Sequence, residues 1–203
     1  MPAGRYRQFS ARVQYWTFSK KRQGGSPAID RREQKTQQAI RNAFLALRAH
    51  KPLERITVKE LAENAQISKA TFYLHYHDIY ELSEALQEDV IQQILSSITQ
   101  ADLFVKDAPA FTRELFGSFF AHQHLIDILF SGTQASVLPI RIEQGIREHI
   151  FAIVPERRDD AAFNIRLTYQ VQGAYYAYSE NQRRFGPDAV LAELDGITRS
   201  LYA

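Results

Sequence analysis

Residues 56–82 read ITVKELAENAQISKATFYLHYHDIYEL, and this stretch decides the fold of the region around it. Thr57 is a favourable N-cap residue, and Glu60 follows three residues later, at the spacing of a capping box. Ser68 is a second N-cap residue, which opens another helix through about Tyr76. We therefore predict two short helices joined by a tight turn, which is a helix-turn-helix unit.

The side chains of this stretch suit such a unit. Ala62 is small enough for two helices to cross closely, while Ile67 and Phe72 are large enough to fill the space beneath the turn. The second helix then turns outward a cation, a small residue, a hydroxyl, a phenol and an imidazole: Lys69, Ala70, Thr71, Tyr73 and His75. Such side chains bind base edges and phosphates. The plain alternative is a solvated lysine and a packed tyrosine.

The rest of the chain carries helical periodicity. Apolar residues at positions 40, 43, 44 and 47 follow the i, i+3, i+4, i+7 rule and predict a helix over residues 31–50, which Pro52 ends. Pro139 is either a first-turn residue or a kink. Further helices are expected from near Asp78 and over residues 109–121, 123–131, 136–154, 160–182 and 188–202. Because no segment alternates apolar and polar residues as a half-buried strand does, we predict an all-α fold.

The composition excludes several classes of protein. The chain of 203 residues has no cysteine, which removes disulfides, thiolate metal sites and cysteine nucleophiles. No stretch approaches the roughly 20 apolar residues that cross a bilayer. The first thirty residues are basic but lack the apolar segment of a secretory signal. We expect a cytoplasmic protein with no membrane partner.

Charge is distributed unevenly behind a net charge of +2. Lys and Arg outnumber Asp and Glu six to one in residues 1–30 and nine to six in residues 31–82, whereas residues 83–203 hold ten against sixteen. A polyanion is therefore attracted to the first 80 residues and repelled by the rest, unless the clustering is chance. We expect three parts: a flexible basic extension (1–30), a DNA-binding domain (31–82) and a helical regulatory and dimerisation domain (83–203).

The basic extension has two interpretations. An arm of this kind can lie in the minor groove beside the main site, with Arg12, Lys20, Lys21 and Arg22 as the contacting residues. A tail with only diffuse attraction to DNA, or a start codon assigned too early, explains the same residues.

The stretch quoted above resembles the DNA-binding domain of the TetR family of transcriptional regulators. The resemblance rests on Thr57, Leu61–Ala62, Ile67–Ser68, Thr71–Phe72–Tyr73 and the pair His75–Tyr76, and it covers about residues 31–86. It implies that Lys69, Ala70 and Thr71 contact bases, that Thr57, Tyr73 and His75 contact the DNA backbone, and that Phe72 and Tyr76 are core residues. It further implies a repressor that binds a palindromic operator in double-stranded DNA as a homodimer.

One position departs from the family pattern. The family usually has a lysine where this chain has Ile79, at the start of the following helix, and that lysine binds a phosphate. The N–H groups of that helix, or cations at Lys59, His77 or the basic extension, are the candidates to replace it. The loss of one phosphate contact lowers the salt dependence of binding by about one counterion without abolishing it.

The same resemblance implies that residues 160–182 and 188–202 pair with their copies in a second chain, and that a small-molecule inducer releases the DNA. Some members of the family activate transcription or sense protein partners instead. The apolar residues of the two helices also suit an intrachain core, and the sequence leaves this division open. Aromatic and polar side chains suitable for a pocket are numerous, so we assign no ligand-binding residue. They include Phe104, Phe111, Phe116, Phe119, Phe120, Phe130, Tyr169, Tyr175, His122, Gln123, His124, Gln134, Arg141, Arg166 and Gln170.

An enzyme is not expected. His122 and His124 are two residues apart and point in different directions on a helix, so they do not form a chelate. No Gly-rich phosphate loop, HExxH or nucleophile motif is present. We predict no catalytic residue, no metal site and no cofactor. The remaining rival is an adaptor protein whose helix-turn-helix no longer binds DNA, and Ile79 favours it.

Overall fold

The computed structural model describes residues 27–98 and 103–202, and all regular structure in these residues is helical. This confirms the predicted all-α fold. The α-helices are α2 (Pro27–Arg48), α3 (Val58–Asn64), α4 (Lys69–Tyr73), α5 (Ile79–Ser96), α6 (Leu103–Lys106), α7 (Ala108–Ala121), α8 (Gln123–Leu129), α9 (Leu138–Ile153), α10 (Ala161–Phe185) and α11 (Pro187–Tyr202). Short 3₁₀ helices lie at Leu53–Arg55 (η1), Gly132–Val137 (η2) and Pro155–Asp159 (η3).

The helices differ from the prediction in three main respects, and the structure also decides between the two alternatives predicted for Pro139. Helix α2 begins at Pro27 rather than at residue 31, because proline lacks only an N–H that the first turn does not need. Helix α4 ends at Tyr73 rather than Tyr76. Helix α6 was not predicted, since four residues are too short to carry a period. Pro139 lies in the first turn of α9, so it does not kink that helix. The basic extension lies outside the described residues, except for the first turn of α2.

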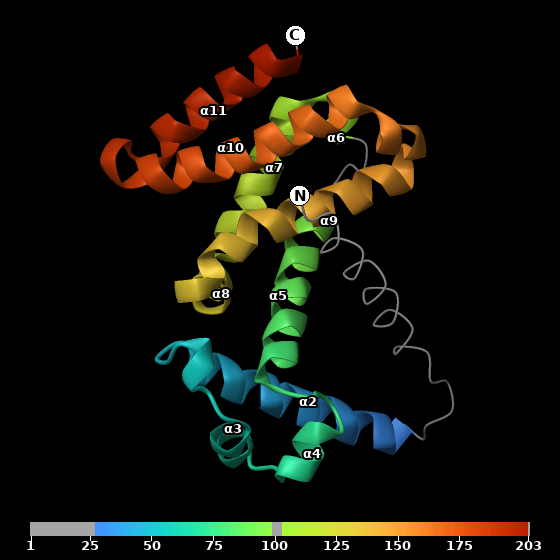
Figure 1. Cartoon of the computed structure of the whole chain (residues 1–203), viewed down its shortest axis with the longest axis vertical. Helices are drawn as coiled ribbons and strands as arrows, with labels where there is room; N and C mark the ends of the chain where they lie inside the picture. Colours follow the sequence, from blue (N-terminus) through green and yellow to red (C-terminus); the bar gives the residue numbers. More distant parts are fainter. Residues whose placement is uncertain (1–26, 99–102, 203) are drawn as a thin grey trace, which may run out of the picture.

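Helix α5 links the two ends of the molecule (Figure 1). Its buried side chains belong to one continuous apolar core, which includes Phe44 and Phe72 at the end formed by α2, α3 and α4. At the other end the same core includes Ile146 of α9 and Leu167 of α10. The core of the helical bundle and the core of the helix-turn-helix are therefore continuous along α5.

Polar contacts reinforce this packing where α2 ends. Arg48 is buried, and its guanidinium donates to the carbonyl of Lys51 at 3.0 Å and to the carbonyl of Ser131, after α8, at 2.8 Å. Beside it, the Thr133 hydroxyl donates to the Glu54 carboxylate at 2.7 Å. Both contacts join the end that contains α3 and α4 to the segment between α8 and α9. Because a buried polar group is costly to leave unpaired, the bond from Arg48 to Ser131 holds the two parts together, and the exposed bond from Thr133 to Glu54 adds to it.

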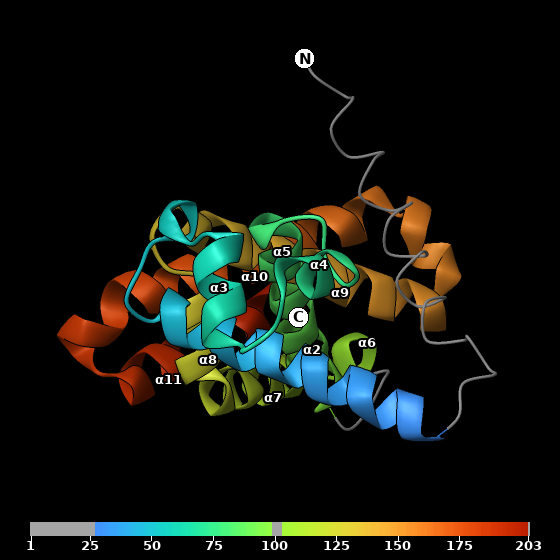
Figure 2. The same ribbon diagram turned by 90° about the horizontal axis from the view of Figure 1, so that it is seen from below.

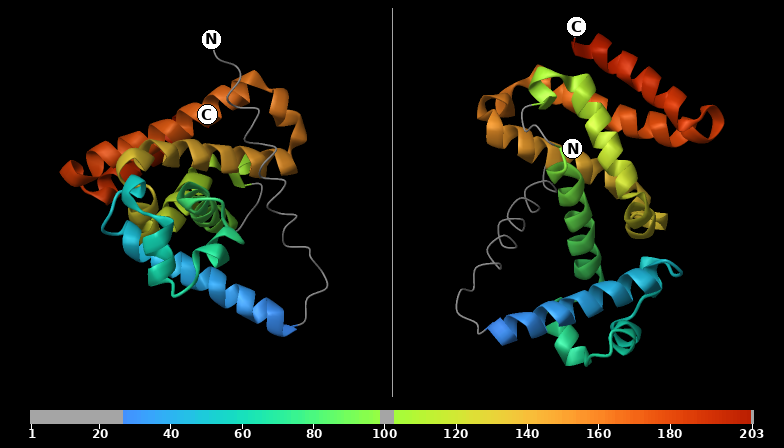
Figure 3. Two further views of the ribbon diagram at one scale, coloured as in Figure 1. Left: turned by 60° about the horizontal axis from the view of Figure 1, so that its bottom comes forward. Right: turned by 180° about the vertical axis from the view of Figure 1, so that it is seen from behind.

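Helices α10 and α11 lie at the end of the molecule away from α3 and α4, and α7 packs against α11 (Figure 3). Many of the apolar residues that the sequence left open between core and interface are buried inside the chain. They are Phe163, Leu167, Val171, Tyr178, Val190 and Leu194. The large apolar residues that are exposed on these helices are Ile165, Tyr169, Tyr176, Phe185 and Ile197, and Ile197 is among those that the sequence left open.

No single helix among the described residues is both long and apolar enough to span a membrane. The two segments Gln123–Leu129 and Gly132–Ile153 together are long and apolar enough by length and composition, but they are bent by 116° relative to each other.

The crossing of α5 and α9 gives a first prediction. A Cβ added at Gly145 would overlap the side chain of Leu95, which is buried in the core. We expect Gly145→Ala to lower the free energy of unfolding by about 1–3 kcal/mol, because a packed core resists added volume. Gly117→Ala is the matched control: it lies in α7 with open space around its Cβ and should be neutral or raise stability by up to about 1 kcal/mol. Urea unfolding followed by circular dichroism measures both, and equal effects would contradict the close packing.

Candidate DNA interface

Side-chain caps start the helices of the helix-turn-helix where the sequence predicts. The Thr57 hydroxyl accepts from the Glu60 N–H at 3.2 Å, and the Ser68 hydroxyl accepts from the Thr71 N–H at 3.0 Å. Asp78 caps α5 in the same way. The Glu60 carboxylate pairs with Lys51 of the preceding loop, so its contact fastens α3 to the end of α2. The start of each helix is therefore fixed by bonds within three residues.

The inner face of the unit is apolar. Leu61 and Ala62 of α3 and Phe72 of α4 are buried, and α3 packs against both α2 and α4. The rings of Phe72 and Tyr76 lie 5.9 Å apart, and burial raises the pKa of the Tyr76 hydroxyl above its ordinary value. A helix of five residues is not stable by itself. The position of α4 therefore depends on its cap and on the burial of Phe72.

Helix α4 ends early because of its own backbone. The N–H groups of His75 and Tyr76 both donate to the carbonyl of Phe72, at 2.9 and 3.0 Å. This sharing tightens the chain after Tyr73 into a turn. As a result, His75 lies just beyond the helix rather than on it.

Helices α3 and α4 lie at the end of the molecule that faces the viewer in Figure 2, and most of the predicted contact residues on or beside them are exposed. Thr57, Lys69, Ala70 and Tyr73 are exposed, and the side chain of Tyr73 keeps 55 % of its surface free. Lys69 and Tyr73 are four residues apart on the helix and so are neighbours. The structure thus leaves these side chains available to a large partner.

Thr71 and His75 are less accessible than the sequence suggests. Both are half-buried, and the Thr71 hydroxyl lies 2.8 Å from the Ser68 hydroxyl. One of these hydroxyls donates to the other, so Thr71 has a reduced set of hydrogen bonds to offer to a base.

Leu74 is an outward residue that the sequence analysis did not single out. It is 83 % exposed, directly after α4, and follows Ala70 by four residues. An apolar residue at helical spacing is normally predicted to be buried, so nothing in the sequence indicated that Leu74 is exposed. Its exposure follows from the early end of α4. An exposed leucine beside an alanine can contact a thymine methyl group.

The start of α5 is poorly suited to replace the phosphate contact that Ile79 lacks. Ile79 is buried in the core. The Glu81 N–H donates to the Asp78 carboxylate at 2.8 Å, and the His77 N–H donates to the Glu81 carboxylate at 2.6 Å. Two carboxylates stand at this helix N-terminus and repel a phosphate. Of the replacement cations, Lys59 and His77 are exposed, whereas the basic extension lies outside the described residues.

Comparison with known proteins gives one relative. Over 91 residues the chain is 33 % identical to a Bacillus subtilis (strain 168) protein named as the uncharacterized HTH-type transcriptional regulator YxbF. The match covers 43 % of this chain and 24 % of the length of that protein, so the chain spans about a quarter of its relative. No family model matches the chain. The similarity supports a transcriptional regulator with a helix-turn-helix, the motif that residues 57–73 form here.

The turn between α3 and α4 yields a second prediction. Gln66 has φ of +54°, a conformation that strains residues with a Cβ and that glycine adopts freely. We expect Gln66→Gly to raise the free energy of unfolding by about 0.5–1 kcal/mol. Gln92→Gly, on the exposed side of α5, is the matched control and should lower it by about 1 kcal/mol. Thermal unfolding of both variants tests this, and a loss of stability at position 66 would mean that the side chain of Gln66 outweighs the strain.

Proposed function

We propose that this protein is a sequence-specific DNA-binding transcriptional regulator of the TetR type. In this proposal it acts in the cytoplasm as a repressor, binds a palindromic operator as a homodimer and releases it when a small-molecule inducer binds. The observation that carries the proposal is helix α4, whose cap and buried Phe72 hold Lys69, Ala70 and Tyr73 outward. The similarity to a helix-turn-helix regulator supports it.

The contacts with DNA divide by chemistry. Lys69 and Ala70, at the start of α4, with Thr71 behind them, are the base-contacting residues of the proposal. Tyr73 and His75 donate to phosphates, and Thr57 offers its hydroxyl or N–H at the start of α3. Leu74 joins the base-contacting group as an apolar residue. Residues 31–82 form the DNA-binding domain, and the excess of acids in residues 83–203 keeps DNA away from the regulatory domain.

A third prediction separates the two kinds of contact. Lys69→Ala should change which base pairs are preferred, costing about 1–3 kcal/mol at the contacted position. Tyr73→Phe should weaken binding to all sequences by a similar factor, because a phosphate contact carries no sequence information. Selection of duplexes from a randomised pool, followed by gel-shift titration, measures both. If Lys69→Ala weakened binding to all sequences equally and Tyr73→Phe changed the preferred base pairs, the base and phosphate assignments would have to be exchanged.

The same assay tests the proposed function itself. The wild-type dimer should retard a duplex from the chain's own upstream region at low salt, and the complex should weaken steeply as salt rises. A folded protein that retards no duplex would favour the adaptor alternative, for which Ile79 and the two carboxylates at the start of α5 are the specific observations.

The proposed homodimer uses the outward face of α10 and α11. On α10, Ile165, Tyr169 and Tyr176 are exposed along one stripe, with the small Gly173 between the two tyrosines. Ile197 of α11 is also exposed. A stripe of large apolar side chains with a glycine in it allows a second helix to pack closely, and exposed apolar patches mark such interfaces. A second copy of this chain offers the same face, as a two-fold dimer requires.

A fourth prediction follows from this face. Tyr169→Glu should convert the dimer into a monomer, because it places a charge in the middle of the apolar stripe. Tyr80→Glu is the matched control: the same change at a tyrosine that is 51 % exposed, on α5. Light scattering coupled to size-exclusion chromatography gives the mass of each variant. A Tyr169→Glu protein that stays dimeric would move the interface elsewhere.

A further inference from the structure

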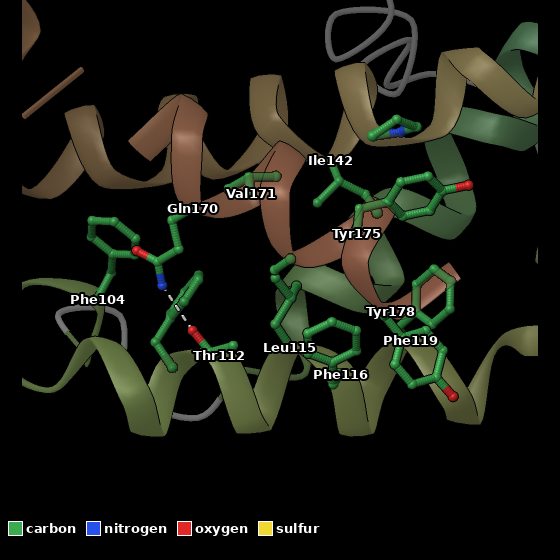
Figure 4. Close-up of a pocket in the computed structure, with 13 residues that line it drawn as sticks. Phe104, Thr112, Leu115, Phe116, Phe119, Ile142, Gln170, Val171, Tyr175 and Tyr178 are labelled. Atoms are coloured by element: carbon green, nitrogen blue, oxygen red, sulfur yellow. Dashed lines mark hydrogen bonds between the residues drawn. The ribbon is translucent and has the colours of Figure 1, made fainter. Parts of the chain in front are cut away.

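The bundle contains a cavity between α7, α9 and α10 (Figure 4). The space between its side chains amounts to about 570 Å³ with the open mouth included, and little of it is wide enough for a water molecule. A ring-sized molecule therefore has to move the walls apart as it binds. Its walls include Phe104, Phe116, Phe119, Ile142, Tyr175 and Tyr178, and none of the residues that line it carries a formal charge at neutral pH. Gln170 and Thr112 supply amide and hydroxyl groups in this apolar setting.

Gln170 holds an unpaired acceptor in this cavity. It is 6 % exposed, and its amide nitrogen donates to the Thr112 hydroxyl at 2.8 Å. That hydroxyl donates its one proton to the carbonyl of Ala108 at 2.9 Å, so toward Gln170 it acts as an acceptor. This arrangement fixes the orientation of the amide. The Gln170 oxygen is left without a hydrogen-bond partner, and in Figure 4 it lies toward Phe104, another cavity residue.

A buried acceptor without a donor is unfavourable, and a molecule that supplies the donor relieves it. The absence of charge in the walls disfavours ionic ligands, because a charge would lose its hydration without gaining a counter-charge. The small free space and the aromatic rings of the walls favour a flat ring that stacks on them or meets them edge to face. Few sites combine these three conditions, and together they define a class of ligand.

We propose that this cavity binds a neutral, flat aromatic molecule that donates one N–H or O–H hydrogen bond to the Gln170 oxygen. The proposal rests on the proposed function in one respect: it assigns the cavity as the inducer site of the regulator. Among the pocket residues considered from sequence, it selects Gln170 and excludes Tyr169, which faces outward on α10.

Indole and 1-benzofuran are suitable probes, because they share shape and size while only indole carries an N–H donor. Isothermal titration of the full chain without DNA should show indole binding about tenfold more tightly than benzofuran, the usual effect of one hydrogen bond. Indole-3-acetate, which is ionised, should bind more weakly than indole. In Gln170→Met the two neutral probes should bind with similar affinity.

Two further variants complete the experiment. Gln182→Met makes the same substitution on the same helix outside the cavity lining, and it should keep the preference for indole. Ala174→Leu fills part of the cavity and should remove binding of both neutral probes, which keeps the test available if Gln170→Met does not fold. Circular dichroism checks the fold of each.

Several results would overturn the proposal. They are no binding of indole to the wild-type chain, equal affinity for indole and benzofuran, or a preference for indole that survives Gln170→Met in a folded protein. Gel-shift titration in the presence of indole is a separate measurement. DNA binding without indole binding would reject the ligand site and keep the regulator, whereas indole binding without DNA binding would reject the regulator and keep the site.

Discussion

The burial of α5 along its length is the constraint on which the rest of this structure depends. Leu82 and Leu86 near its start share a core with α2 and α4, and Ile91 and Ile94 near its end share the same core with α9. Because one rigid helix belongs to both ends, the helix-turn-helix cannot rotate freely against the bundle. The five-residue α4 inherits its direction from this packing, since it has too few backbone bonds of its own to hold one.

A second link joins the same two ends through polar groups. Arg48 at the end of α2 is bonded to the carbonyl of Ser131, and α9 begins seven residues later at Leu138. Pro139 and Ile142 in the first turns of α9 are walls of the cavity. The residue that binds Arg48 at the helix-turn-helix end and a wall of the proposed ligand site are thus close to each other in the chain. A ligand that widens the cavity acts on a segment that α2 is bonded to, which is the kind of coupling that a released repressor requires.

The electrostatics at the start of α5 differ from those expected of the TetR family, which the helix-turn-helix resembles. The position that usually holds a lysine in that family is occupied by a buried isoleucine. Beside it, the Asp78 carboxylate accepts from the Glu81 N–H, and the Glu81 carboxylate accepts from the His77 N–H. These acids stabilise α5 and repel a phosphate at the same place. In the proposed function, DNA binding therefore depends on the start of α3, on α4 and on cations outside the start of α5.

The sequence by itself determined the all-α fold and the residues at which α3, α4 and α5 begin. Thr57, Ser68 and the region of Asp78 were predictable because a cap is a bond to an N–H three residues away, and no distant residue is needed to form it. Phe72 as core and Tyr73 as an outward residue were also predictable, from the motif. Which of the six candidate residues touch DNA stays a prediction.

Only the tertiary structure decided how equivalent apolar residues are used. Along α10, Leu167 and Val171 face the core while Ile165 and Tyr169 face outward. Both faces carry apolar residues at helical spacing, so the sequence pattern does not tell which face is buried. Leu74 is exposed because the N–H groups of His75 and Tyr76 share the Phe72 carbonyl and end α4 early. The spacing of apolar residues does not predict a helix end of this kind. The unpaired oxygen of Gln170 likewise depends on Thr112, 58 residues away, whose proton is already given to Ala108. Local bonds can be read from neighbouring residues, whereas burial and hydrogen-bond satisfaction depend on which distant helices meet.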